Sequence, residues 1–187
     1  IPPPFDLRQA IQSALLAAEP LARVNMKLFY SLQMDGGDAA AHQSSICAAA
    51  AAAAAARDFG GRFLQQPCAV VYPSSPDDIL RLMLAIPTIQ RSLFLATHNH
   101  HHHRRPGPKV CVAARGNGHS VHGQAQAADG IVIEMQSLKE PPILSVGREG
   151  DGSLYYAEVC AGRLWVEVLD AAVRLYGLAP RSWTDYL

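Results

Sequence analysis

The chain carries no net charge. Sixteen lysine and arginine residues balance sixteen aspartate and glutamate residues among 187. Proteins that bind nucleic acid or anionic membranes usually show an excess of basic residues. We therefore expect neither nucleic acid nor a membrane among the partners of this protein.

Long apolar runs and a leader with a basic flank are also lacking. No apolar stretch reaches the roughly 18–20 residues that a membrane-spanning helix needs. The first residue is Ile1 rather than methionine, and no signal peptide is visible. We expect no membrane-spanning helix.

The four cysteines, Cys47, Cys68, Cys111 and Cys160, show no Cys-x-x-Cys spacing. That spacing is typical of zinc sites and dithiol redox motifs, so we expect neither. Cys111 and Cys160 stand in apolar, strand-like runs and are expected to be buried small hydrophobic residues. The sequence leaves open whether any two cysteines form a disulfide.

The first 56 residues give the weakest signals. Residues 48–56 are nine consecutive alanines, and alanine is the best helix former, so a helix running into Arg57 is expected. We treat residues 1–56 as a low-complexity segment of uncertain structure. Residues 57–187 are expected to form one domain.

From Asp58 onward the pattern predicts an α/β fold. Cys68–Tyr72 is a short apolar strand. Ser75 is suited to cap a helix, Pro76 to begin it and Asp78 to complete a capping box, and we expect Pro87 to end that helix. Its buried face is expected to comprise Ile79, Leu82, Met83 and Ile86.

The second half predicts more strands and one further helix. Strands are expected at about residues 109–114, 130–135, 143–146 and 154–160. The clearest helix is Leu164–Tyr176, which Gly177 should end. Its apolar stripe at i, i+3, i+4 and i+7 spacing is expected to face the core and comprises Trp165, Val168, Leu169, Ala172, Val173 and Tyr176.

A glycine-rich loop follows the strand at 109–114. Gly116, Gly118 and Gly123 allow a backbone with positive φ and a close approach to a ligand, and His119 lies between them. The loop matches a dinucleotide fingerprint poorly, because Val121 takes the place of the third glycine and a strand rather than a helix follows. A plain glycine-rich turn with an incidental histidine remains the alternative for the loop taken alone.

Three blocks carry a resemblance to a known family. The first is Asp58-Phe59-Gly60 followed by Ala69–Ser75, the second is the Arg-Gly-Asn-Gly-His-Ser and Gly-Gln pattern of residues 115–124, and the third is residues 179–187, which end in Trp-Thr-Asp-Tyr-Leu. In these blocks the chain resembles plant cytokinin dehydrogenases, flavoproteins with an FAD-binding domain of the p-cresol methylhydroxylase (PCMH) type. The resemblance covers about residues 57–187.

The resemblance implies a PCMH-type domain with covalent FAD. His119 takes the place of the histidine that is bonded to the 8α-methyl carbon of FAD, and a neutral imidazole has a ring nitrogen with a free lone pair for such a bond. The resemblance also assigns FAD binding to Ala114, Gly116, Asn117, Gly118, Ser120, Gln124 and Asp185.

The implied reaction is the oxidative cleavage of the N6-isoprenoid side chain of cytokinins. Asp185 takes the place of an aspartate that accepts the proton or hydrogen bond of the substrate amine while hydride passes to the flavin. Adenine and an unsaturated aldehyde are the implied products, and a quinone-type compound or oxygen is the implied electron acceptor. The resemblance further implies a monomer that is extracellular, apoplastic or vacuolar.

Other hypotheses remain open. A sugar or alcohol oxidase with covalent flavin would share the fold, but it would not be expected to carry the block at Trp183–Leu187. Because both ends look cut, we expect a fragment, the N-terminal part of the FAD-binding domain. If it is a fragment of an active enzyme, the chain is expected to be inactive on its own. The alternative is that it is a truncated remnant without catalytic activity.

The histidines at 98 and 100–103 raise the alternative of a metal-binding protein. A His-rich tract can bind divalent metals. Here the run is followed by Arg104 and Arg105, and neither an acidic residue nor a cysteine is near. We expect an exposed loop insertion between the helix that ends near Pro87 and the next strand, with no metal site.

Overall fold

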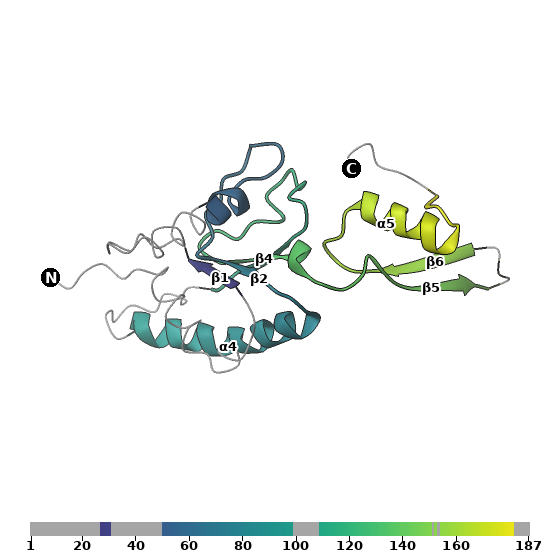
Figure 1. The fold of residues 1–187 in the computed structure, drawn as a ribbon. Coiled ribbons are helices and arrows are strands. Elements are labelled where there is room, and N and C mark those ends of the chain that lie inside the picture. Colours follow the sequence, from purple (N-terminus) through teal and green to yellow (C-terminus); the bar gives the residue numbers. More distant parts are fainter. Residues whose placement is uncertain (1–26, 31–49, 99–108, 151, 153, 182–187) are drawn as a thin grey trace, which may run out of the picture.

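The structure is a computed structural model that describes residues 27–30, 50–98, 109–150, 152 and 154–181. Two groups of elements lie beside each other (Figure 1). The first is a sheet in the order β1 (Lys27–Tyr30), β2 (Ala69–Tyr72), β4 (Ile131–Glu134) and β3 (Val112–Arg115). The second is a hairpin of β5 (Ile143–Glu149) and β6 (Leu154–Val159), followed by α5 (Trp165–Ala171) and the π-helical turn η2 (Ala172–Tyr176).

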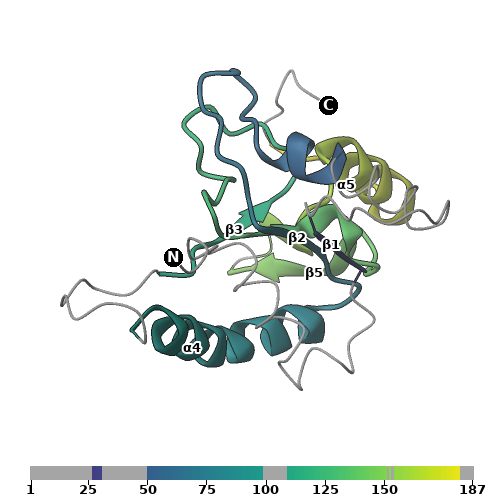
Figure 2. The same cartoon turned by 90° about the vertical axis from the view of Figure 1, so that its left-hand side faces the viewer.

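The sheet has a mixed topology. Strands β2, β4 and β3 run parallel, and β1 pairs antiparallel with β2 at the edge. Helix α4 (Pro76–His98) covers one face, and a short helical segment over residues 50–55 lies on the other (Figure 2). The α/β class expected from the sequence is therefore confirmed.

The central strands are apolar on both faces, as parallel strands between two covering layers must be. On the α4 face, Val71, Ile131 and Ile133 pack with Leu82 and Ile89 of the helix. On the opposite face the cluster comprises Ala55, Val70, Ala127 and Val132, with Tyr72 and Ala113 partly buried against it. The alanine run thus contributes small side chains to the core.

The start of α4 confirms the predicted capping box. The Asp78 carboxylate accepts hydrogen bonds from the Ser75 N–H at 3.1 Å and from the Ser74 N–H and hydroxyl, both at 2.8 Å. The Ser75 hydroxyl in turn accepts the Asp78 N–H at 3.4 Å. These bonds satisfy backbone donors that the first helical turn leaves without intrahelical partners.

The predicted end of this helix at Pro87 is wrong. Proline removes one helical hydrogen bond, but Pro87 lies on the exposed face, where the freed carbonyl of the preceding turn can reach water. Beyond it, Ile89 is fully buried, and the Gln90 side chain accepts the Val110 N–H at 2.7 Å. Tertiary contacts therefore hold the second half of the helix. The buried face also differs, since Met83 is 48% exposed.

Two further expectations need correction. Cys160 is buried as predicted, but Cys111 is exposed, because it precedes the edge strand β3; both are free thiols. Trp165, expected in the core, is 49% exposed because the hairpin covers only Val168 of that stripe fully. The end of the helical segment is confirmed, with Gly177 at φ +64°.

Several expectations fall on residues outside the described ranges. They include the run at 99–103, the block at 182–187 and Cys47. Of the histidine run only His98 is placed, as the last residue of α4. None of the helices in the described part of the chain has the length and apolar character that crossing a membrane requires.

The Asp78 cap yields a test of stability against pH. Burial alone would raise the pKa of Asp78, but hydrogen bonds from Ser74 and Ser75 outweigh it and lower the pKa below the ordinary 3.8. A lowered folded-state pKa stabilises the fold above the unfolded-state pKa, and this contribution is lost as pH falls through the folded-state value. We expect Asp78→Asn to cost about 1–2 kcal/mol at pH 7.

Urea denaturation measured from pH 7 down to pH 2 checks this expectation. The difference between wild type and Asp78→Asn should shrink at the acid end. Asp77→Asn is the matched control, because Asp77 lies in the same helical turn but is exposed. A difference that stays constant over the whole pH range would contradict the assigned role of the carboxylate.

Candidate functional site

The candidate site is the loop that leaves the carboxyl end of β3. Residues 116–130 join the neighbouring parallel strands β3 and β4, and no helix intervenes in this connection. Ligands in open α/β sheets commonly bind outside the carboxyl ends of the strands. The same edge holds Tyr72, Arg115 and Glu134, the last residues of β2, β3 and β4.

The loop is shaped by its own hydrogen bonds and two glycines. Gly118 and Gly123 have φ of +76° and +71°, which side chains other than hydrogen rarely permit. The Ser120 hydroxyl accepts the Ala125 N–H at 3.4 Å, and the Gln124 side chain accepts the His122 N–H at 2.9 Å. Ser120 and Gln124 were predicted as ligand contacts; in the structure their side chains hold the loop through these bonds.

His119 is exposed and held from two sides. Its ring lies edge-to-face with Phe59 at a centroid distance of 4.8 Å and an angle of 61°. Its Nε2 lies 3.3 Å from Nδ2 of Asn117, whose Oδ1 accepts the Gln136 side-chain N–H at 3.1 Å. The loop and Phe59 are joined directly, because the Phe59 N–H donates to the Ser120 carbonyl at 2.9 Å.

The segment around Phe59 is fixed by Asp58, a buried carboxylate. Its Oδ1 accepts the N–H groups of Arg62 and Phe63 at 2.9 and 3.1 Å. Gln126, also buried, donates to the carbonyls of Ala56 and Phe63 and ties the segment to the loop. The first and second sequence blocks therefore meet in space.

An ion pair lies beneath the loop. Arg115 Nη1 and Glu134 Oε2 are 2.8 Å apart, and their side chains are only 19% and 12% exposed. Burial raises the pKa of Glu134, and Arg115 opposes that rise. The pKa of the Tyr72 hydroxyl is raised by burial and then by the Glu134 carboxylate. The edge therefore concentrates charge in a region of reduced solvation.

A cavity opens between the loop and the start of α5. Its volume is about 210 Å³, and its lining comprises Gly116, Asn117, His119, Gly162, Arg163, Leu164 and Trp165. Ligand pockets usually measure about 300–1,000 Å³, so this cavity has room for one end of a larger ligand. A Cβ placed on Gly116 would meet no atom within 4 Å, so the backbone there is open to approach.

The far wall of this cavity is set by close packing at Gly162. This residue has φ +83°, and a Cβ there would overlap the backbone of Met135 and Gln136 in η1 (Met135–Ser137). Arg163 donates to the Leu138 carbonyl and lies 3.6 Å from the Glu167 carboxylate. The two groups of elements are thereby joined next to the loop.

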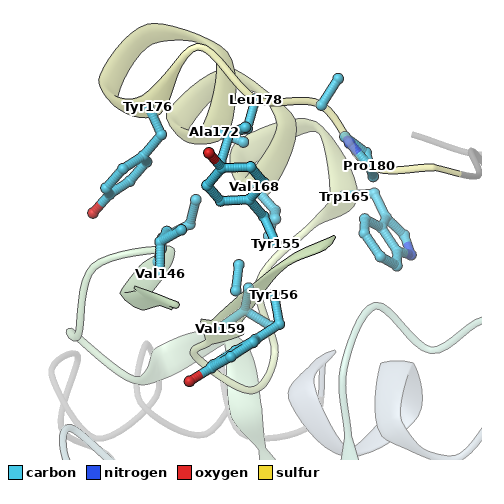
Figure 3. Close-up of a pocket in the computed structure, with 13 residues that line it drawn as sticks. Val146, Tyr155, Tyr156, Val159, Trp165, Val168, Ala172, Tyr176, Leu178 and Pro180 are labelled. Carbon is cyan, nitrogen blue, oxygen red and sulfur yellow. The ribbon is translucent and has the colours of Figure 1, made fainter. Parts of the chain in front are cut away.

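A second, apolar cavity of about 250 Å³ lies between the hairpin and α5–η2. Trp165 and Pro180 lie at one end of it and Tyr176 at the other (Figure 3). Tyr155, Tyr156 and Tyr176 are 44–55% exposed, so the aromatic face is largely uncovered in this chain. Sequence reasoning missed this face because it assigned the helical stripe to a closed core.

Not every predicted site residue can be placed. The loop brings Gly116, Asn117 and His119 to one cavity, while Ala114 lies exposed on β3. Asp185 lies outside the described residues. Phe59, Gln126 and Gln136 were not predicted; Phe59 belongs to a block of the resemblance, but the other two carried no recognisable signal. No group of three His, Cys, Asp or Glu residues within the described ranges is arranged to hold a metal.

Known proteins resemble this chain along most of its length. Cytokinin dehydrogenase 3 of Oryza sativa subsp. japonica is 47% identical over 130 residues, which cover 70% of this chain and 21% of that protein. The chain belongs to the cytokinin dehydrogenase family. No protein-family model matches it.

Other cytokinin dehydrogenases give the same result. Cytokinin dehydrogenase 8 of Oryza sativa subsp. indica is 45% identical over 136 residues, covering 70% of this chain and 23% of that protein. Cytokinin dehydrogenase 1 of Arabidopsis thaliana is 39% identical over 131 residues, covering 70% of this chain and 19% of that protein. The chain spans about a fifth of the length of these curated relatives.

The packing at Gly162 gives a prediction. Gly162→Ala places a methyl group against the backbone of Met135, whereas Gly61→Ala, at a similar φ of +65°, meets nothing within 4 Å. Both changes cost about 1–2 kcal/mol through φ strain. Gly162→Ala should cost about 1–3 kcal/mol more through overpacking, measured by urea denaturation. Equal losses for the two variants would show that the contact does not constrain the fold.

Proposed function

We propose that this chain supplies the flavin-attachment segment of a cytokinin dehydrogenase. The whole protein would cleave the N6-isoprenoid side chain of N6-isopentenyladenine-type cytokinins oxidatively, giving adenine and an unsaturated aldehyde. The observation that carries the proposal is the exposed His119 imidazole at the mouth of a cavity, on a loop at the carboxyl ends of the parallel strands β3 and β4. The identity with curated cytokinin dehydrogenases supports it.

The described residues fit an FAD group. The Gly116 backbone is open, and Asn117 offers amide groups next to the His119 ring. Ala114, Gly118, Ser120 and Gln124 would add backbone N–H groups or polar atoms along the same loop. The cavity has room for only one end of such a ligand. We therefore assign the rest of the FAD site to parts of the whole protein other than this cavity.

Two residues of the chain would take part in the chemistry. When bound, FAD supplies the acceptor for a hydride from the carbon next to the substrate amine. His119 would hold it covalently through a ring nitrogen. Asp185 would accept the proton or hydrogen bond of the amine, which requires a carboxylate within hydrogen-bond reach of that nitrogen. The electron acceptor proposed for the second half-reaction is a quinone-type compound or oxygen.

Flavin attachment can be tested in a chimaera. In the chimaera, the chain would replace the matching segment of rice cytokinin dehydrogenase 3. That relative is about five times as long as the aligned stretch, so it supplies the rest of a whole enzyme. We expect a yellow protein that keeps its flavin after denaturation and precipitation. His119→Ala should abolish this retention, because no imidazole remains to form the bond.

The matched control is His122→Ala, three residues along the same exposed loop. It should retain flavin as the unaltered chimaera does. Complete loss of flavin on precipitation of the folded, unaltered chimaera would disprove covalent attachment. Equal loss in both variants would argue against a specific role for His119.

The role of Asp185 is tested separately by turnover. In the same chimaera, Asp185→Asn should keep covalent flavin while turnover of N6-isopentenyladenine falls on the order of 10²–10⁴-fold, the usual contribution of a positioned general base. Asp170→Asn is the control, because Asp170 is an exposed residue that pairs with Arg174 in the next helical turn. Full activity in Asp185→Asn, or turnover by the 187-residue chain alone, would overturn this assignment.

A further inference from the structure

The guanidinium of Arg115 lies directly against the turn that carries His119. A Cβ at Gly118 would be 2.5 Å from Nη2 and 2.9 Å from Cζ of Arg115. This is tighter than a carbon can approach, so the guanidinium and a side chain at 118 cannot both occupy this place. The φ of +76° favours glycine at 118, and a side chain there would also displace the guanidinium.

The guanidinium is itself fixed from the other side. Glu134 stands opposite Arg115 in the β3–β4 register, and its Oε2 lies 2.8 Å from Nη1. Both side chains are largely buried, so water can replace little of this contact. An arginine presents a rigid, planar fork of donors, which a lysine ammonium on a flexible stem does not.

We propose that Arg115 is a positioning residue, whose guanidinium, held by Glu134, supports the Gly118–His119 peptide from beneath and thereby sets the place of the His119 imidazole. This rests on the proposed function, in which that imidazole carries the flavin. The Gly118–His119 peptide is the only covalent link between the Gly118 Cα, against which the guanidinium lies, and the His119 Cα. A displaced support would therefore move the imidazole relative to Phe59, which now lies at 4.8 Å.

The competing explanation is that the ion pair only joins β3 to β4. The variant Arg115→Lys distinguishes this explanation from the proposed supporting role. Lysine keeps a positive charge beside Glu134 but has no flat group to place under Gly118. A role limited to joining the strands predicts little change in the His119 environment. A supporting role predicts a clear change with the fold retained.

Two measurements on the 187-residue chain test the support itself. Because the Phe59 ring lies 4.8 Å from the His119 ring, we expect it to shift the NMR signals of the His119 ring protons. Arg115→Lys should move these signals toward their unfolded values. Arg174→Lys is the control, because Arg174 lies in η2 and forms an exposed pair with Asp170. The second measurement is the fall in melting temperature caused by Gly118→Ala. This fall should be about 3–6 °C smaller in an Arg115→Ala background than in the wild-type background, because the clash with the guanidinium is then absent.

The consequence for attachment is measured in the chimaera, as a rate per folded protein. Arg115→Lys should slow covalent flavin incorporation on the order of 10²-fold, since displacement by about 1 Å can cost that much. Arg174→Lys should not slow it. Unchanged His119 signals together with equal effects of Gly118→Ala in both backgrounds would overturn the inference.

The two proposals can fail independently. If the unaltered chimaera binds no flavin covalently, the proposed function fails, while the signals of His119 and the Gly118–Arg115 cycle still decide whether Arg115 supports the turn. If flavin attaches and Arg115→Lys attaches it at the unaltered rate, the inference about Arg115 fails and the proposed function stands.

Discussion

The parallel pairing of β3 with β4 is the constraint on which the site depends. It sets Arg115 opposite Glu134 at the carboxyl edge of the sheet, so that an ion pair forms where the loop begins. Parallel neighbours need a long crossing connection, and here that connection is the glycine-rich loop itself. The loop is therefore anchored at both ends by one strand pair, and His119 stands four residues beyond the anchor.

The other walls of the site depend on contacts between segments that are distant in sequence. Phe59 reaches His119 because Asp58 and Gln126 fix the turn that contains Phe59. Gln136 reaches Asn117 from η1, and Gly162 allows the hairpin group to approach the same place. Without these contacts, an exposed histidine on a glycine-rich loop would sample many positions. The contacts reduce the number of positions that the His119 side chain can take. Restricting a reacting group in this way is a recognised source of rate in covalent chemistry.

The sequence predicted those features of the fold that depend on interactions between neighbouring residues. The capping box at Ser75 and Asp78 and the left-handed Gly177 were found because each depends on neighbouring residues alone. The helix beyond Pro87 was missed, because buried Ile89 and the bond from Val110 to Gln90 outweigh the local penalty. The loop with His119 was recognised by its motif. Its support was not, because Arg115 and Glu134 meet only through the strand register.

Peptide mapping of the denatured chimaera tests the central claim most directly. Trypsin should release residues 116–139 as one peptide, since no lysine or arginine lies between Arg115 and Lys139. The account predicts that this peptide carries the mass of the flavin and that fragmentation places it on His119 rather than His122. A flavin bound at His122, at another peptide, or at none would contradict the account.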